Sequence, residues 1–391
     1  MTAVTLADRL RHVEGSPTLA LAATAKALAK AGKPVLDFTA GEPDFPTPEA
    51  IKRAGVEAIS ANHTRYTPAA GIPELRAAVA SAINRRRNTG YQPSQVLVAC
   101  GTKHALYNTF QALCQPGDEV IILSPYWVSF PALIHLSGAK PVVVETREED
   151  RFQPDPEAVR AALTPATKAI IINSPSNPTG AVIDEGRLAA LAAIARQRGL
   201  IVISDEIYDQ LVYPPTKHVS VLDVDPKLAE QTVLVGGVSK TYSMTGWRIG
   251  WAAGPQPWIQ AMDTIQSHST SNPSSISQHA ALAAITGDQQ PVAKMLAEFQ
   301  QRRDRLVLGL NKLPPLRCTM PGGAFYAWCN VSGLGQSSDA TAVQWLEDTL
   351  IATVPGEGFG APGYIRMSFA ASLKTIDEAL QRLSQWLSKR R

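Results

Sequence analysis

The sequence predicts an α/β protein with a large domain, in which a mostly parallel seven-stranded sheet lies between helices, and a smaller α+β domain built from both termini. At 391 residues the chain is too long for one small core. Its middle alternates short apolar runs with longer amphipathic stretches, as strands and their covering helices do. Its last third instead mixes long helices with aromatic, strand-like pieces.

Seven runs rich in Val and Ile are expected to form the sheet, because strands covered on both faces are apolar along their length. The runs are Val96–Ala99, Glu119–Leu123, Lys140–Val144, Ala169–Asn173, Ile201–Ser204, Thr232–Val235 and Ile249–Ala253. Between two of them, Leu188, Leu191 and Ile194 recur at helical spacing, and Gly199 is expected to end that helix. Strands that alternate with helices in this way favour parallel pairing.

The two ends of the chain predict the smaller domain. The expected pieces are helices at Thr18–Gly32, around Val292–Leu313 and at Thr375–Leu387, and strands at Ala324–Asn330 and Tyr364–Phe369. We therefore expect an N-terminal arm and part of the small domain at 1–46, the large domain at 47–290 and the rest of the small domain at 291–391. Because the sequence shows no flexible linker, a continuous helix is expected to join the two.

Composition and charge exclude several classes of protein. The net charge of +3 is scattered, which argues against nucleic acid or a membrane surface as the main partner but leaves cations for a small anion. The cysteines form no CxxC pair, so neither a disulfide framework, a zinc site nor another metal site is expected. The first residues, Met1–Arg11, have no apolar run, and no stretch reaches the roughly 18 apolar residues of a membrane span. A cytoplasmic location is expected.

Two loops that follow apolar runs are candidates for ligand contacts. Gly101 lies between a strand and an amphipathic helix, where a glycine lets backbone N–H groups point at an anion favoured by the helix dipole. Thr102 adds a hydroxyl donor. In the stretch Asn173–Gly180 two prolines make a rigid loop that can hold the amide of Asn177 in one orientation. A plain structural turn is the alternative for either loop.

The next two motifs bring a carboxylate and a lysine to strand ends. Asp205 ends an apolar run, at the edge where open α/β sheets bind ligands, and Tyr208 shares its side if a helical turn follows. Lys240 follows another run among small residues, and Arg248 precedes the last run. A desolvated lysine is nucleophilic because its pKa falls. Alone, Asp205 is typical of a helix N-cap and Lys240 of a surface lysine; together they indicate a reactive-amine site.

These motifs together resemble those of the class I aminotransferases, which are fold type I pyridoxal-phosphate enzymes. The block around Lys240 resembles the family's cofactor-attachment signature. Further stretches resemble its substrate-side loop, its "Y…G…LR" segment, its ring-stacking loop and its carboxylate-binding strand: Ala40–Phe45, Arg65–Pro68, Ser124–Trp127 and Tyr364–Phe369. The resemblance runs from about Thr18 to near the C-terminus and is greatest to the bacterial aspartate aminotransferase branch, with its "SKxxxMTGWRxG" signature.

The resemblance implies that pyridoxal 5′-phosphate (PLP) is bound to Lys240 as a Schiff base, and that the freed amine later moves a proton. Asp205 would pair with the pyridine nitrogen and keep it protonated, so that the ring withdraws electrons. Tyr208 and Asn177 would hydrogen-bond the 3′ oxygen, and Trp127 would lie against the ring.

The resemblance also implies a phosphate site. Gly101, Thr102 and Arg248 would hold the phosphate, since a guanidinium binds phosphate through two hydrogen bonds. The family often has a hydroxyl residue three positions before the lysine, but this chain has Gly237 there. Tyr66 would reach the phosphate from a neighbouring subunit, so a homodimer with active sites at the interface is expected.

For the amino acid and 2-oxo acid substrates, the resemblance implies that Arg366 binds the α-carboxylate with help from Asn177, Trp127 and the Gly41 backbone. Lys103 aligns with a lysine that faces the distal carboxylate in this branch, which favours aspartate with 2-oxoglutarate. The alternative is that Lys103 only adds positive charge near the phosphate of the cofactor.

Other activities on the same scaffold stay open, because the cofactor-handling residues are shared among them. They are aromatic, alanine or prephenate aminotransferases, 1-aminocyclopropane-1-carboxylate synthases and C–S β-lyases. Relatives that accept prephenate tend to carry a basic residue near the N-terminus, where this chain has Glu14, so prephenate is not favoured. A non-catalytic regulatory domain is expected to carry an N-terminal DNA-binding module, for which the chain has no room before Gly41. A dinucleotide-dependent dehydrogenase lacks support because no GxGxxG follows the first strand.

Overall fold

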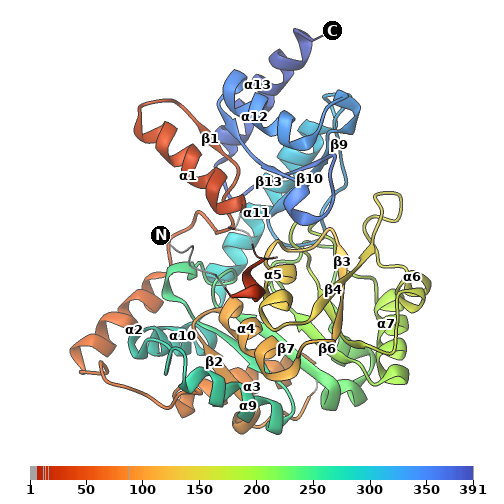
Figure 1. Ribbon diagram of the computed structural model, residues 1–391. Helices are drawn as coiled ribbons and strands as arrows, with labels where there is room; N and C mark the ends of the chain where they lie inside the picture. The colour runs from red at the N-terminus through yellow and green to blue at the C-terminus, as the bar shows by residue number, and fades with distance from the viewer. Residues whose placement is uncertain (1–6, 12, 14, 16, 88, 391) are drawn as a thin grey trace, which may run out of the picture.

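The computed structural model describes residues 7–11, 13, 15, 17–87 and 89–390. Figure 1 shows a larger lower part, in which a sheet lies among helices, and a smaller upper part. The seven-stranded sheet has the order β2-β8-β7-β6-β5-β3-β4, in which only β8 runs antiparallel to its neighbours. Its strands are β2 (Val96–Ala99), β3 (Glu119–Ser124), β4 (Lys140–Glu145), β5 (Thr167–Asn173), β6 (Ile201–Asp205), β7 (Thr232–Gly237) and β8 (Gly250–Ala253). The predicted mostly parallel sheet is confirmed.

Helices cover both faces of this sheet, which explains why its inner strands are largely apolar. The edge strand β4 differs, because Lys140, Val143 and Glu145 are exposed. On β6, Ile203 packs into the core formed with α4 (Thr102–Leu113), α5 (Ser129–Leu136) and α9 (Gln256–Ser267). The neighbouring Val202 packs into the opposite core. That core includes helices α2 (Glu49–Ser60), α3 (Pro73–Arg87), α7 (Glu185–Arg198) and α10 (Ser275–Thr286). Gly199 ends α7 with a left-handed φ of 63°, as the sequence predicts.

The upper part combines both ends of the chain. Its four-stranded sheet has the order β12-β13-β10-β9, formed by Val354–Pro355, Tyr364–Ser368, Tyr326–Asn330 and Arg317–Cys318. Helices α1 (Pro17–Lys30), α12 (Ser338–Thr349) and α13 (Leu373–Ser388) accompany it. The short strand β1 (Leu36–Asp37) pairs in parallel with β11 (Ile351–Ala352), which joins the N-terminal segment to the C-terminal part. The boundaries at 46/47 and 290/291 stay a prediction.

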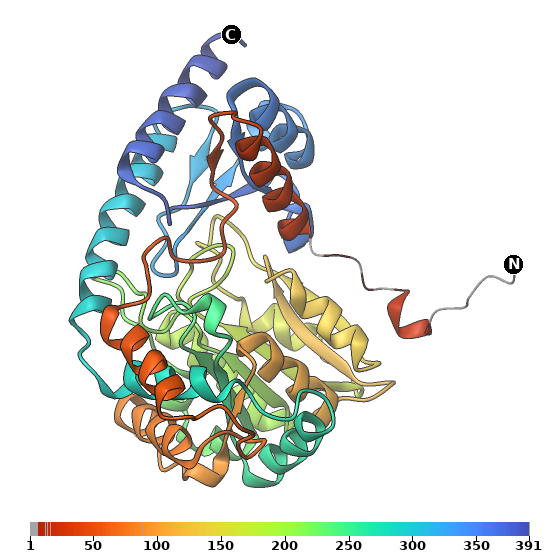
Figure 2. The ribbon, with the colours of Figure 1, turned by 90° about the vertical axis from the view of Figure 1, so that its left-hand side faces the viewer.

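A single long helix, α11 (Gln290–Leu310), runs from the lower part to the upper part along one side (Figure 2). Val292 near its start packs in a core of the large sheet, whereas Phe299 and Leu306 pack in the core of the upper part. This is the continuous helix that the sequence leads us to expect. The remaining helices are α6 (Pro156–Ala161), α8 (Val221–Val224) and the 3-10 helices Asp8–Leu10, Pro93–Gln95, Pro226–Gln231, Thr245–Trp247, Ser332–Leu334 and Glu357–Phe359.

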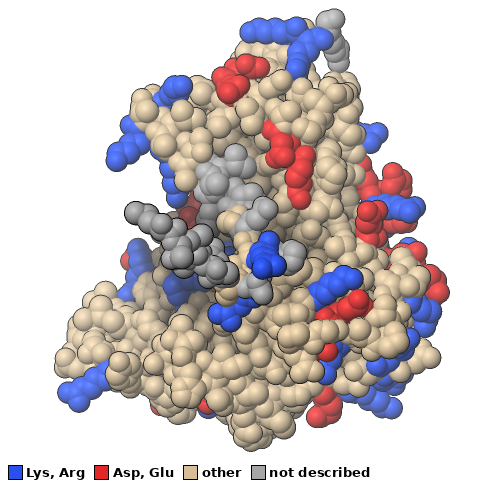
Figure 3. Space-filling view, viewed as in Figure 1, with Lys and Arg blue, Asp and Glu red and all other residues tan. Residues whose placement is uncertain are grey.

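Basic and acidic side chains are interspersed on the face shown in Figure 3, in keeping with the scattered charges of the sequence. Among the described helices, none has the length and apolar character needed to cross a bilayer.

Candidate active site

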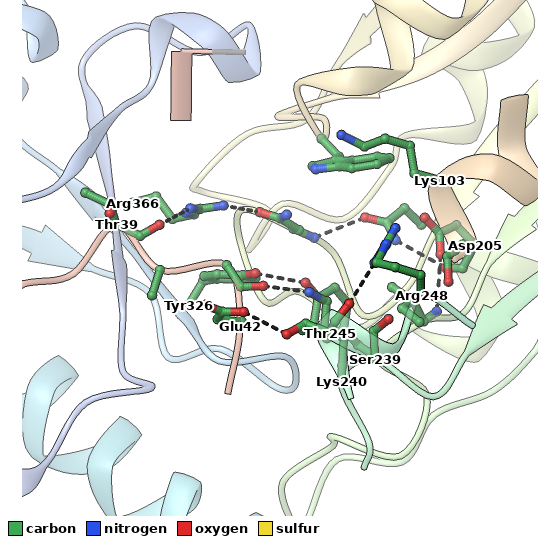
Figure 4. Close-up of a pocket in the computed structure, with 18 of the residues that line it drawn as sticks. Thr39, Glu42, Lys103, Asp205, Ser239, Lys240, Thr245, Arg248, Tyr326 and Arg366 are labelled. Atoms are coloured by element: carbon green, nitrogen blue, oxygen red, sulfur yellow. Dashed lines mark hydrogen bonds between the residues drawn. The ribbon is translucent and has the colours of Figure 1, made fainter. Parts of the chain in front are cut away.

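A cavity of about 510 Å³ lies between the carboxyl ends of the large sheet and the upper part (Figure 4). Ten of the residues predicted to form the site line it: Gly41, Thr102, Lys103, Trp127, Asn177, Asp205, Tyr208, Lys240, Arg248 and Arg366. Gly101 is not among the lining residues but lies against the guanidinium of Arg248, which is. Tyr66 is 91% exposed and does not line this cavity. The volume is in the range of sites that enclose small molecules.

Asp205 is placed at the base of the cavity by the end of β6. The N–H of Ile207 donates to its Oδ1 at 3.2 Å, and the turn that follows brings Tyr208 to the same cavity. Asp205 is only 3% exposed, and this burial raises the pKa of its carboxyl to about 7. A carboxylate in such a place is stabilised in its charged form when a cation binds beside it.

Lys240 lies beyond the end of β7 with its amine in the cavity. Its Nζ donates to the backbone oxygen of Gly41 at 2.6 Å. Burial lowers the pKa of Lys240 to about 8; the carboxylate of Glu42 opposes this change, and the guanidinium of Arg248 adds to it. A substantial share of the amine is therefore neutral and nucleophilic near that pH.

Arg248 and the N-terminus of α4 form a cradle for an anion. Gly101, with a φ of 89°, caps the helix, and a Cβ added to it would lie 2.4 Å from Nη2 of Arg248. Thr102 donates from Oγ1 to the backbone oxygen of Gly236 at 3.0 Å. A Cβ at Gly237 would lie 2.6 Å from that hydroxyl oxygen, so the glycine makes room for Thr102. The family often has a hydroxyl residue at the position of Gly237; in this chain the hydroxyl of Thr102 uses the space that such a side chain would need.

Arg366 lies at the opposite side of the cavity, on β13. It is 3% exposed, and its guanidinium donates to Asn177 Oδ1 at 3.0 Å and to the backbone oxygen of Thr39 at 2.9 Å. Its Nε has no hydrogen-bond partner in the part of the chain that the structure describes. Burial lowers the pKa of this guanidinium. A buried cation held by neutral groups is a strong site for a carboxylate.

Lys103 is a further cation at the cavity, on the first turn of α4. Its Nζ lies 4.9 Å from the ring centroid of Trp127, within the range of a cation–π contact. Burial lowers the pKa of Lys103, and the charge of Arg248 lowers it further. The two arginines and Lys103 give the cavity a cationic character at both ends.

Several lining residues were not predicted for the site: Lys26, Asp37, Thr39, Ala40, Glu42, Asn173, Ile207, Ser239, Thr245 and Tyr326. Glu42 accepts a hydrogen bond from Thr245 Oγ1 at 2.7 Å, and the hydroxyl of Tyr326 lies 2.9 Å from that of Tyr208. Glu42 belongs to the Ala40–Phe45 stretch that carries the resemblance, and Tyr326 belongs to a predicted strand. The sequence contains the segments but not the direction in which these side chains point.

The comparisons with known proteins agree with this geometry. Residues 33–383 match the family "Aminotransferase class I and II", so the chain belongs to that family and is a PLP-dependent aminotransferase. An aspartate aminotransferase of Geobacillus stearothermophilus is 45% identical over 390 residues, which cover 98% of this chain and 99% of that protein. An aspartate/prephenate aminotransferase of Cereibacter sphaeroides is 44% identical, with 97% of each chain covered.

Among solved structures, the aspartate aminotransferase of Thermus thermophilus with maleate superposes with a TM-score of 0.94 at 42% identity, covering 98% of this chain and 99% of that one. The enzyme is thus a fold type I aminotransferase of the aspartate branch.

The residues of the cavity fit PLP, the cofactor of the family. Asp205 supplies a buried carboxylate whose charged form needs a cation such as a protonated ring nitrogen. Lys240 supplies an amine of lowered pKa. The N-terminus of α4 and Arg248 supply an anion cradle, and the absence of a Cβ at Gly101 lets the guanidinium of Arg248 lie against the start of the helix.

Proposed function

We propose that this enzyme transfers the amino group of L-aspartate to 2-oxoglutarate, yielding oxaloacetate and L-glutamate in a ping-pong reaction at one site. The observation that carries the proposal is the pair of cations at Arg366 and Lys103, which lie at different parts of one cavity. Both substrates of this reaction are dicarboxylates. Arg366 suits the α-carboxylate that all amino donors share, and Lys103 suits the distal carboxylate that distinguishes aspartate and glutamate.

The proposed cofactor contacts follow from the positions of the side chains. Lys240 would attach the cofactor, and Asp205 would hold its ring nitrogen in the protonated state. Tyr208 and Asn177 would donate hydrogen bonds to its 3′ oxygen, and Trp127 would cover the ring face. Gly101, Thr102 and Arg248 would hold the phosphate. Bound PLP supplies an electron sink for the electron pair that remains when the substrate Cα loses its proton.

The chain's own groups then have defined tasks. Arg366 binds the α-carboxylate and, together with Asn177, fixes the orientation of the Cα–H bond. The freed amine of Lys240, with its lowered pKa, would take the proton from the substrate Cα and deliver it to C4′ of the cofactor. Asp205 would stay charged and would keep the ring nitrogen protonated throughout.

The decisive experiment for the aspartate specificity is Lys103→Met with aspartate and alanine as donors. Loss of the charged contact between the Lys103 ammonium and a distal carboxylate is expected to cost about 2 kcal/mol, which lowers kcat/KM for aspartate about 30-fold. Alanine has no distal carboxylate, so its kcat/KM is expected to stay within about twofold. Lys140→Met is the matched control, because Lys140 lies at the start of β4, outside the cavity, with its side chain 74% exposed.

The outcome also separates the alternative role of Lys103. If this lysine only adds positive charge near the phosphate, Lys103→Met weakens PLP binding and lowers the rates with aspartate and alanine together. A donor screen then tests the other activities on this scaffold. If aspartate gives no oxaloacetate while alanine, an aromatic amino acid or cystathionine reacts, the aspartate proposal fails.

We also propose that the functional unit is a homodimer. Tyr66 is 91% exposed, and two apolar side chains on nearby α2, Val56 and Ile59, are 61% and 53% exposed. Because Tyr66 does not line the cavity of its own chain, its proposed contact with the phosphate requires a second copy. Tyr66→Phe should weaken PLP binding in the dimer, and a monomer in sedimentation equilibrium would contradict the proposal.

Glu14, on which the expectation against prephenate rests, lies outside the described residues. That expectation stays a prediction, as does the cytoplasmic location.

A further inference from the structure

Tyr326 lies in the cavity between Arg366 on one side and Lys240 and Arg248 on the other (Figure 4). It is 1% exposed, and its hydroxyl oxygen lies 2.9 Å from that of Tyr208. The guanidinium carbon of Arg366 lies 4.4 Å from the centre of the Tyr326 ring. One side chain therefore touches both the proposed carboxylate-binding residue and a proposed cofactor-binding residue.

This arrangement is held by a sheet and not by a loop. Strands β10 and β13 pair antiparallel, with Tyr326 opposite Ser368 and Trp328 opposite Arg366. Tyr326 and Arg366 are thus diagonal neighbours on one face, a separation that long side chains span. Phe325 packs edge-on against the ring of Tyr208, with ring centroids 5.6 Å apart. Phe325 and Tyr326, neighbours in the chain where β10 begins, therefore both contact Tyr208.

The hydroxyl pair has two possible proton arrangements, since either oxygen can be the donor. If Tyr208 donates to Tyr326, its only hydrogen is not available to the cavity. If Tyr326 donates, the hydrogen of Tyr208 is free to point at a ligand. A cation over a phenol ring withdraws electron density and makes the phenol a better donor, so the charge of Arg366 favours donation by Tyr326.

A carboxylate bound at Arg366 offsets that charge. Burial raises the pKa of Tyr326 and of Tyr208, and in both the nearby charge of Arg366 acts in the opposite direction. When the charge is offset, Tyr326 becomes a weaker donor to Tyr208, and Tyr208 in turn a weaker donor to its own acceptor.

We propose that Tyr326 is a positioning residue that transmits the occupancy of the carboxylate site at Arg366 to the hydroxyl of Tyr208. This proposal rests on the proposed roles of Arg366 and Tyr208. It adds a second connection to the direct hydrogen bond between Arg366 and Asn177. Substrate binding would thereby change the hydrogen bonding of the cofactor through two paths.

The test is a pH titration of the visible absorption band of the PLP-loaded enzyme, with and without saturating maleate, a dicarboxylate that has no amino group. In the unaltered enzyme, maleate is expected to raise the pKa of the absorbing group. Tyr326→Phe keeps the ring beneath Arg366 but removes the hydroxyl. The rise in pKa caused by maleate should then be smaller by roughly 0.5 of a pKa unit. This is the amount by which donation from Tyr326 is expected to strengthen the hydrogen bond that Tyr208 donates to a charged acceptor.

Tyr364→Phe is the matched control. Tyr364 lies on the same strand as Arg366, but its hydroxyl contacts Glu148 at 3.2 Å, and it does not line the cavity. This variant should show the full rise. Tyr208→Phe breaks the hydroxyl pair from its other side, so the effects of Tyr208→Phe and Tyr326→Phe on the rise should be non-additive.

A full rise in Tyr326→Phe, or additive effects in the double variant, would overturn the proposal. If Tyr326→Phe does not load PLP, a full rise in Tyr208→Phe overturns it equally. Failure of the proposed function gives a different result, because maleate would then leave the absorption band of the unaltered enzyme unchanged.

Discussion

Replacing Gly101 by alanine tests the proposed phosphate cradle through a single methyl group. Gly101 has a φ of 89°, and a Cβ at this position would lie 2.4 Å from Nη2 and 2.8 Å from Cζ of Arg248. A non-glycine residue in such a backbone conformation costs about 1–3 kcal/mol. In addition, the guanidinium of Arg248 must move away from the N-terminus of α4.

Gly117→Ala is the matched control for the backbone effect. Gly117 has a φ of 98°, but a Cβ there would meet no atom within 4 Å. Both variants should lose about 1–3 kcal/mol of unfolding free energy. Only Gly101→Ala should also bind PLP more weakly, because a displaced Arg248 loses hydrogen bonds to the phosphate worth about 1.5–3 kcal/mol. That loss corresponds to about a 10- to 150-fold higher Kd.

Urea denaturation of the cofactor-free proteins measures the unfolding free energy, and an absorbance titration with PLP measures the Kd of the cofactor. If Gly101→Ala binds PLP as tightly as Gly117→Ala, then the close approach of Arg248 to Gly101 does not determine phosphate binding, and the proposed cradle is wrong.

Two further predictions concern pH. Glu206 is 4% exposed; burial alone would raise its pKa, but a hydrogen bond from His218 and the charge of Arg87 hold that pKa well below its usual range. Glu206→Gln should therefore lower the unfolding free energy by about 3 kcal/mol at neutral pH, in calorimetry or urea denaturation. The difference in unfolding free energy between the variant and the wild type should shrink below about pH 4.3, where Glu206 of the unfolded wild-type chain takes up a proton. A difference that does not change with pH would contradict the ion pair. Because the pKa of Lys240 is lowered to about 8, the rate at which the cofactor-free protein attaches PLP should rise with pH and level off above about 8. In stopped-flow absorbance, a rate that still rises steeply towards pH 10 would contradict that lowered pKa.

The sequence predicted the large sheet well because its strands are long enough to show their apolar character. Each predicted run overlaps a strand, and the ends differ by at most two residues, as in Ala169–Asn173 against Thr167–Asn173. The strands β1 and β11 contain two residues each and show no periodicity, so their pairing could not be predicted. Such pairings depend on contacts between segments that are far apart in the chain.

Some residues of the candidate site could likewise be predicted from the sequence, whereas others could not. Residues at the ends of strands, such as Asp205, could be predicted because strand and position appear together in the sequence. Tyr326 lies in a predicted strand, but its contact with Tyr208 spans 118 positions and depends on which face of the strand it occupies. Thr245 meets Glu42 across 203 positions. Neither contact leaves a local pattern in the sequence.

The most direct test of the central claim is the visible spectrum of the PLP-loaded enzyme during stepwise addition of L-aspartate. We expect aspartate to convert the band of the Lys240-attached cofactor to that of pyridoxamine phosphate, and 2-oxoglutarate to restore it. Lys240→Ala should lack the band of the attached cofactor. A band that aspartate leaves unchanged would contradict the proposed donor, and a band that persists in Lys240→Ala would contradict the role of Lys240.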